Sequence, residues 1–176
     1  MQELLLVDHQ DNVIGYGEKL SVHQKGELHR AFSIVVFNSK GELLLQKRAK
    51  DKYHSGGLWT NACCSHPLKD EELEDTLHKK LMGEMGFDCE LHFLYKFIYR
   101  SVYENGLTEH EYDYVYVGSF DGKPNPDPEE AEDFKWMKVE NIKLDILQHP
   151  ETYSSWFKLI ITELDQYSQQ IHKLIF

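Results

Sequence analysis

The sequence predicts an α+β protein, and three features of its apolar pattern carry this prediction. Residues 89–100 and 109–120 alternate apolar and polar side chains with the two-residue period of β-strands. Before them, residues 73–81 hold leucines at four-residue intervals, as on one face of a helix. Residues 151–173 are apolar at helical spacing again. The predicted order of elements along the chain is strands, one helix, more strands and then helices. This order indicates an α+β or α/β/α sandwich.

Two hairpins are expected in the first third of the chain. Residues 3–7 and 13–16 are predicted strands around a turn rich in Asp, Asn and Gln. Residues 31–38 and 43–48 form a second pair around a Ser-Lys-Gly-Glu turn. Between the pairs, residues 19–29 carry two histidines and two lysines, and their polarity predicts a loop.

The central helix has recognisable ends. Asp70 is the expected N-cap, acidic residues crowd the first turn, and Gly86 can serve as the C′ residue. This gives a helix of about four turns. Farther on, prolines and acids in residues 123–133 predict a loop of solvated carboxylates, and residues 134–139 predict a short strand.

Composition narrows the class of protein. The 176 residues suffice for one domain with a full core, so residues 1–176 are expected to form a single domain. A net charge of −11 disfavours binding along a nucleic-acid backbone. No apolar run approaches the roughly 20 residues that cross a bilayer, and no signal peptide is recognisable. We therefore expect a cytoplasmic protein with reduced cysteines, without nucleic-acid or membrane partners.

Residues 59–67 concentrate chemically active side chains. On an extended segment Cys64 and His66 point to one side and Cys63 to the other. A free cysteine is also a common core residue, so chemistry and packing both remain open at this point. Trp156 fits core packing by its helical spacing.

Charged residues suggest a polar site near these thiols. Residues 48–52 hold three positive charges, which suit either a solvated loop or a clamp for a diphosphate or carboxylate. Glu109, Glu111 and Asp113 share one face of their strand, and valines continue that face. This pattern suggests a face that passes from a wet site into the core. The opposite face carries Tyr112, Tyr114 and Tyr116, so the sequence leaves open which of the two faces is buried.

Four ordered motifs carry a family resemblance. They are residues 28–33 (LHRAFS), 57–67 (GLWTNACCSHP), 84–86 (EMG) and 109–111 (EHE). With them the sequence resembles a type I isopentenyl-diphosphate delta-isomerase, a branch of the Nudix superfamily, over nearly the whole chain. The resemblance implies a Nudix-type α/β/α sandwich with a mixed central sheet and an N-terminal β-hairpin. Its core spans about residues 29–165, and residues 1–28 form an extension that contributes metal and substrate residues.

The resemblance also implies a set of metal and substrate ligands. A Mn²⁺, Zn²⁺ or Mg²⁺ ion is implied in a three-histidine, two-glutamate site made of His23, His29, His66, Glu109 and Glu111. A second ion, Mg²⁺, arrives with the substrate diphosphate and contacts Glu84, and the diphosphate is held by Lys19, Arg48 and Lys52.

The implied reaction converts isopentenyl diphosphate to dimethylallyl diphosphate in isoprene biosynthesis. One proton is added to an alkene and another is removed, through a tertiary carbocation. The resemblance assigns proton delivery to Glu111 and Tyr99 and proton removal to Cys64. Trp156 then faces the cation with its ring, which favours a functional role over plain packing.

The general Nudix hydrolase signature is eroded in this chain. Glu71 fits it, whereas Ser65, Lys79, Lys80 and Gly83 replace its first glycine, its Arg-Glu pair and one of its later acids. A hydrolase would thereby lose most of its metal-collecting carboxylates. A Nudix hydrolase of a nucleoside diphosphate derivative is the alternative hypothesis, and a non-catalytic metal-binding module is a third. The protein is expected to work as a monomer or homodimer.

Overall fold

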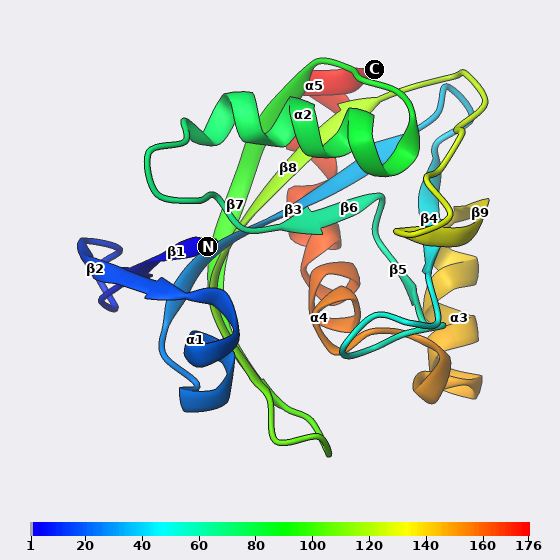
Figure 1. The fold of residues 1–176 in the computed structure, drawn as a ribbon. Helices are drawn as coiled ribbons and strands as arrows, with labels where there is room; N and C mark the ends of the chain where they lie inside the picture. Colours follow the sequence, from blue (N-terminus) through cyan, green and yellow to red (C-terminus); the bar gives the residue numbers. More distant parts are fainter. Residues whose placement is uncertain (1) are drawn as a thin grey trace.

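The computed structural model describes residues 2–176, in which nine strands form one mixed sheet (Figure 1). The strands are β1 (Glu3–Val7), β2 (Val13–Glu18), β3 (His29–Phe37), β4 (Glu42–Arg48), β5 (Trp59–Thr60), β6 (Cys63–Ser65), β7 (Leu91–Val102), β8 (Thr108–Ser119) and β9 (Ala131–Lys138). The α-helices are α1 (Lys19–Lys25), α2 (Leu73–Met85), α3 (Val139–Gln148), α4 (Ser155–Glu163) and α5 (Ser168–Ile175). Short 3₁₀ turns, Pro150–Thr152 and Leu164–Tyr167, adjoin α4.

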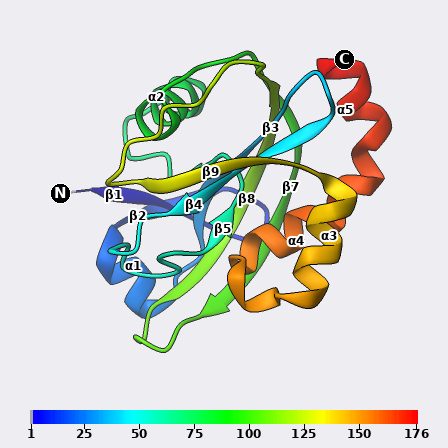
Figure 2. The ribbon, with the colours of Figure 1, turned by 90° about the vertical axis from the view of Figure 1, so that its right-hand side faces the viewer.

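Helices cover both faces of the sheet. Helix α2 lies on one side of the strands, and α3, α4 and α5 lie on the other (Figure 2). Each side has its own apolar cluster: Leu77, Leu81 and Met85 of α2 pack on the face that carries Ile34. The predicted α/β/α sandwich is confirmed. Within residues 2–176, no helix is both long enough and apolar enough to span a bilayer.

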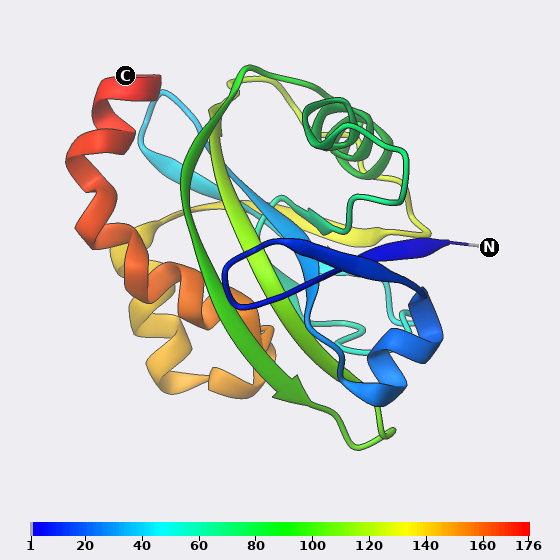
Figure 3. The ribbon, with the colours of Figure 1, turned by 90° about the vertical axis from the view of Figure 1, so that its left-hand side faces the viewer.

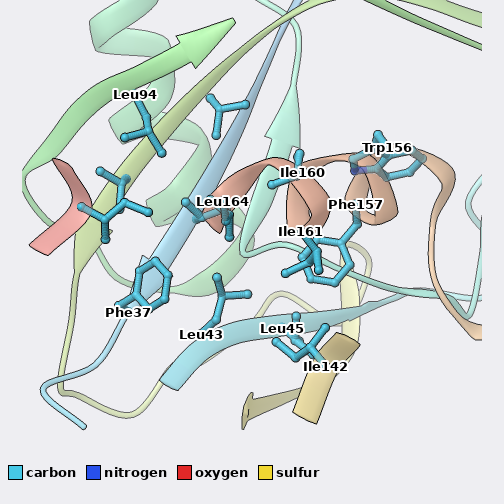
Figure 4. Close-up of a cluster of buried hydrophobic side chains, with 14 of the residues drawn as sticks. Phe37, Leu43, Leu45, Leu94, Ile142, Trp156, Phe157, Ile160, Ile161 and Leu164 are labelled. Atoms are coloured by element: carbon cyan, nitrogen blue, oxygen red, sulfur yellow. The ribbon is translucent and has the colours of Figure 1, made fainter. Parts of the chain in front are cut away.

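The second cluster lies beneath α3 and α4 (Figure 4). Leu43 and Leu45 of β4 meet Ile142 and Phe157 there, and all four side chains are fully buried. Trp156 belongs to the same cluster, so its predicted contact with the core is correct.

Strand β3 organises the sheet. It pairs antiparallel with β1 and β6 and parallel with β8. The expected N-terminal hairpin of β1 and β2 is confirmed. The second predicted hairpin is correct only at its turn, because β3 and β4 share the single pair Phe37–Leu43 and then diverge. Strand β6 pairs with β3 and β5 pairs with β4, so residues 59–65 lie between the two diverging strands.

Two details of the helices differ from the prediction. Residues 19–25, predicted as loop, form α1 (Figure 3), because the Glu18 carboxylate accepts hydrogen bonds from the backbone N–H groups of Leu20 (3.0 Å) and Ser21 (2.9 Å). Helix α2 begins at Leu73 and not after Asp70, whose φ of 66° places it in a preceding turn.

The end of α2 was predicted correctly. Gly86 has a φ of 72°, and its N–H donates to the Met82 carbonyl. A Cβ at this position would lie 2.3 Å from the Asn125 carbonyl oxygen, so glycine is also required by space.

Strand β7 breaks its predicted alternation. A register shift between Phe93 and Tyr95 leaves Phe93 47% exposed while Leu94 and Tyr95 are both buried. Leu91 and Phe93 therefore do not share a face with Tyr95 and Tyr99. Helix α3 was not predicted as a separate element, and β9 begins three residues earlier than expected, at Ala131.

Candidate active site

Strand pairing brings three reactive side chains together. Parallel pairing of β3 with β8 sets His29 opposite Glu111, and antiparallel pairing of β7 with β8 sets Tyr99 opposite the same Glu111. Side chains at paired positions share a face of the sheet. The Glu109, Glu111 and Asp113 face is the buried one, as its continuation into Val115 and Val117 suggested.

Asn61 fixes the segment that carries the cysteines. Its buried amide donates hydrogen bonds to the carbonyl oxygens of Ile34 (3.2 Å) and Cys63 (2.7 Å). Its Oδ1 accepts one from Trp156 Nε1 (3.2 Å). The asparagine thus ties β3, β6 and α4 together, and Cys64 faces the site with His66 while Cys63 packs in the core on the other face, as predicted.

Three imidazoles gather beside the Glu111 carboxylate and form a group of four donors with it. One ligand atom from each of His23, His29, His66 and Glu111 lies within 4.8 Å of the others, and all four residues are buried. His66 Nε2 lies 2.8 Å from Glu111 Oε1, and His29 Nε2 lies 3.6 Å from the same oxygen. The donors come from α1, β3, β8 and the residue after β6.

The histidine rings are oriented as metal-binding rings are. His23 Nδ1 lies 2.6 Å from the Lys19 carbonyl and His29 Nδ1 lies 2.8 Å from the Glu27 carbonyl, so each Nδ1–H donates. Their Nε2 atoms are buried without a hydrogen-bond partner. Burial also lowers the pKa of His66 to about 4, which keeps that ring neutral. Three imidazoles and one carboxylate fit a divalent cation.

Glu109, predicted as the fifth ligand, is not part of this four-donor group. Its Oε1 lies 2.8 Å from His54 Nε2. Its Oε2 accepts hydrogen bonds from the hydroxyls of Tyr99 (2.9 Å) and Tyr103 (3.0 Å). The structure nevertheless keeps Glu109 in the wall of the same cavity as Glu111.

The residues predicted to be catalytic all line one cavity of about 100 Å³: Cys64, Tyr99, Glu111 and Trp156. The Tyr99 hydroxyl donates to Glu111 Oε2 at 2.6 Å. Burial raises the pKa of the Cys64 thiol well above its ordinary value, and the Arg48 guanidinium, 3.9 Å from the sulfur, offsets this in part.

The basic residues line the same cavity. They are the three predicted diphosphate ligands Lys19, Arg48 and Lys52, joined by Lys80. Lys79 lies outside the cavity, is 75% exposed and pairs with Glu71.

Glu84 lies in the cavity wall, far from solvent. Burial raises its pKa to about 7, and the nearby Glu130 adds to the rise. Glu130, predicted as a solvated acid of a loop, instead pairs with Lys52 inside the cavity wall.

Five further cavity residues were not predicted as site residues: Gln46, Tyr53, His54, Ser65 and Glu130. Tyr53 and His54 follow the basic stretch directly, but no periodic pattern marks them. Their signal in the sequence was only an aromatic and an imidazole beside two glycines.

Comparison with solved structures identifies the fold. It is similar to that of DR0079 from Deinococcus radiodurans, with a TM-score of 0.78, 16% identity and coverage of 92% of this chain and 98% of that one. A MutT protein from Methanosarcina mazei aligns with a TM-score of 0.67, 17% identity and coverage of 80% and 95%. The NUDIX domain family matches residues 27–158, so fold and sequence define a NUDIX protein.

Curated relatives show which family of NUDIX proteins the chain belongs to. Isopentenyl-diphosphate Delta-isomerase 2 of Photorhabdus laumondii is 52% identical over 161 residues, 92% of this chain and 91% of the relative. Isopentenyl-diphosphate Delta-isomerase 2 of Aromatoleum aromaticum is 49% identical over 154 residues, 88% of this chain and 82% of the relative. The chain belongs to the isopentenyl-diphosphate Delta-isomerase family, as its motifs predicted.

Proposed function

We propose that this protein converts isopentenyl diphosphate to dimethylallyl diphosphate, a step in isoprene biosynthesis. One observation carries the proposal: a thiol, Cys64, and a hydrogen-bonded acid pair, Tyr99 and Glu111, line one cavity ringed by basic side chains. The reaction needs one group to give a proton to carbon and another to take one away. The relatives' names agree with this chemistry.

His23, His29, His66 and Glu111 are proposed to hold a divalent cation, with Glu109 as the predicted fifth ligand. The buried, unpartnered Nε2 atoms of His23 and His29 support this assignment. When bound, Mn²⁺, Zn²⁺ or Mg²⁺ supplies positive charge that fixes the Glu111 carboxyl group.

Proton addition is assigned to Glu111. In its protonated form, Glu111 gives its proton to the terminal alkene carbon, and the electron pair of the double bond forms the new carbon–hydrogen bond. The Tyr99 hydroxyl donates to Glu111 Oε2, which stabilises the carboxylate that remains. The resulting tertiary carbocation is assigned to the ring face of Trp156, whose π-electrons stabilise positive charge.

Proton removal is assigned to Cys64. Its thiolate takes a proton from the carbon next to the cationic centre, and the electron pair of that bond forms the new double bond. The Arg48 guanidinium beside the sulfur stabilises the thiolate and so offsets part of the rise in the thiol pKa that burial causes.

The diphosphate is proposed to bind to Lys19, Arg48 and Lys52, with Lys80 beside them and Mg²⁺ on Glu84. The Lys52 ammonium pairs with Glu130 in the cavity wall, and this pair has to separate if Lys52 is to reach a phosphate. The N-terminal residues 1–28 take part through Lys19 and His23.

We also propose that the substrate is a small molecule and that neither nucleic acid nor a membrane is a partner. The net charge of −11 supports the first exclusion. We further propose that the chain forms a single domain and that it acts in the cytoplasm as a monomer or homodimer.

Proton and carbon NMR in heavy water tests the function. The protein is incubated with isopentenyl diphosphate and Mg²⁺, and released phosphate is assayed in parallel. We expect the dimethylallyl isomer to appear carrying solvent deuterium, without phosphate. Phosphate or nucleotide release from nucleoside diphosphate derivatives, with isopentenyl diphosphate unchanged, would support the hydrolase instead.

A further inference from the structure

Glu109 accepts hydrogen bonds from three side chains on two segments of the chain, the loop after β4 and the end of β7. His54 Nε2 lies 2.8 Å from its Oε1, and the hydroxyls of Tyr103 and Tyr99 lie 3.0 and 2.9 Å from its Oε2. The Tyr99 hydroxyl is also 2.6 Å from Glu111 Oε2. Tyr99 has one proton and two carboxylate acceptors, so the two glutamates compete for it.

His54 is held so that it donates to Glu109. Ser55 Oγ lies 3.3 Å from His54 Nδ1 and can donate to it, which leaves the ring proton on Nε2. The ring is stacked on Tyr103 at 4.7 Å between centroids, with 15° between planes, and meets Trp156 edge to face at 5.9 Å. These contacts fix the ring, and the side chain is only 2% exposed.

Tyr103 is also aimed at Glu109 through a chain of hydroxyls. Ser101 donates to Ser155 at 2.9 Å, and Ser155 lies 3.3 Å from the Tyr103 oxygen. Since Ser101 supplies the proton that Ser155 accepts, Ser155 can give its own proton to Tyr103. The Tyr103 proton then remains for Glu109, and bonds in such a chain strengthen one another.

We propose that His54 and Tyr103 are positioning residues that satisfy Glu109 and thereby commit the Tyr99 proton to Glu111. A carboxylate has about four acceptor positions, so these two donors leave room on Glu109 for a cation. Without them, Glu109 is a buried carboxylate whose remaining protein donor is Tyr99, and it draws that proton from Glu111. The kinetic consequence rests on the proposed function, whereas the hydrogen-bond assignment does not.

The Tyr99 hydroxyl proton gives a readout that needs no turnover. In proton NMR of the Mg²⁺-containing full-length protein, a hydroxyl proton in a 2.6 Å bond to a carboxylate resonates far downfield. Tyr99→Phe identifies the signal by removing it. We expect His54→Phe to shift it upfield, because the proton is then shared with Glu109. His54→Gln should restore much of the downfield chemical shift of the Tyr99 proton, since the glutamine amide also donates a hydrogen bond.

Tyr103→Phe separates the hydrogen bond from the packing, because the stacked ring stays. It should shift the Tyr99 signal upfield, and a circular dichroism spectrum like that of the parent protein shows that the fold is kept. An unchanged signal in both His54→Phe and Tyr103→Phe overturns the proposal. His78→Phe, at an exposed histidine of α2 that pairs with Asp88, is the matched control and should leave the signal in place.

Kinetics supply the second test. We expect His54→Phe to lower kcat about tenfold, the usual size for a hydrogen bond to a charged group, while KM changes less than about twofold. In the Tyr99→Phe background, His54→Phe should lower kcat by less than about twofold, because the hydroxyl whose proton His54 directs to Glu111 is absent. Fully additive losses overturn the proposal. If the parent protein does not turn over isopentenyl diphosphate, the proposed function fails and the NMR result alone decides the hydrogen-bond assignment.

Discussion

The Arg48 guanidinium lies beside the Cys64 sulfur, with 3.9 Å between Nη1 and Sγ, and its Cζ lies over the Trp156 ring, 5.3 Å from the ring centroid. One cation therefore contacts both the proposed base and the ring proposed to face the carbocation. This relationship makes Cys64 and Arg48 the first residues to test.

Cys64→Ala should abolish isomerisation. Removing a group that transfers a proton in catalysis typically costs 10²- to 10⁴-fold in rate, so we expect kcat to fall by about 10³-fold or more. Turnover is measured by NMR with isopentenyl diphosphate. Cys63→Ala removes the neighbouring thiol, which faces the core beneath α2, and is the matched control. Full activity of Cys64→Ala would remove the thiol from the mechanism.

Metal should stabilise the fold through the buried histidines. A ligand present at 100 times its Kd adds about 2.7 kcal/mol to the free energy of unfolding. We therefore expect chelation with EDTA to lower Tm, and Mn²⁺, Zn²⁺ or Mg²⁺ to restore it to different extents. Scanning calorimetry measures both. His29→Ala should abolish the metal-dependent rise, whereas His92→Ala on β7, outside the four-donor group, should keep it. A metal-dependent rise that persists in His29→Ala would contradict the assignment.

The Asp11 carboxylate should make the free energy of unfolding depend on pH. Burial raises the pKa of its carboxyl, but hydrogen bonds from Tyr114, Lys96 and Arg30 outweigh this and hold the pKa below its ordinary value. A lowered pKa means that the stabilisation is complete above the unfolded value near 3.8 and is lost as pH falls through the folded value.

Urea unfolding of Asp11→Asn measures this contribution. At pH 7 the substitution should cost about 1–3 kcal/mol, as expected for a hydrogen-bonded charge. Below the unfolded value near 3.8, the difference between the two proteins should shrink as pH falls toward the lower pKa of the folded carboxylate. Asp51→Asn, at an exposed position, should leave the parent curve unchanged. A constant difference from pH 7 to pH 3 would show that the charge of Asp11 contributes nothing.

Packing of α2 on the sheet should dominate local stability. Leu77 is 1% exposed in the cluster between α2 and β3, so Leu77→Ala should cost about 2–5 kcal/mol. Leu147 in α3 is 80% exposed, and Leu147→Ala should stay within about 0.5 kcal/mol of the parent. Equal losses in urea unfolding would contradict the assignment of the core.

Regular elements were predictable because their signals are local. The two-residue alternation of β8 and the leucine stripe of α2 each report burial on one face, and tertiary packing uses that face. Helix α1 was missed because seven residues give too little periodicity, and its start depends on the Glu18 side chain. The register shift in β7 adds one residue to one strand, which no alternation pattern reveals.

The residues of the candidate active site likewise divide into those that the sequence predicts and those that it does not. Cys64, Glu111, His29 and His66 lie in the motifs, His23 came from the wider resemblance, and the fold brings them to one place. His54, Tyr103 and Glu130 could not be predicted, because their roles arise from contacts between distant segments. The loop acid Glu130 meets Lys52 across 78 positions of sequence, and no pattern along the chain reports such a pair.

The parallel pairing of β3 with β8 has a consequence for the synthesis of the protein. Its register joins His29 to Glu111, so the four donor atoms meet only after β8 has been added to the sheet. A nascent chain that has emerged from the ribosome only as far as α2 holds all three histidines but has no Glu111 to complete the group. The complete group of four donors is therefore available to an ion only late in synthesis, after the first seven strands have been made.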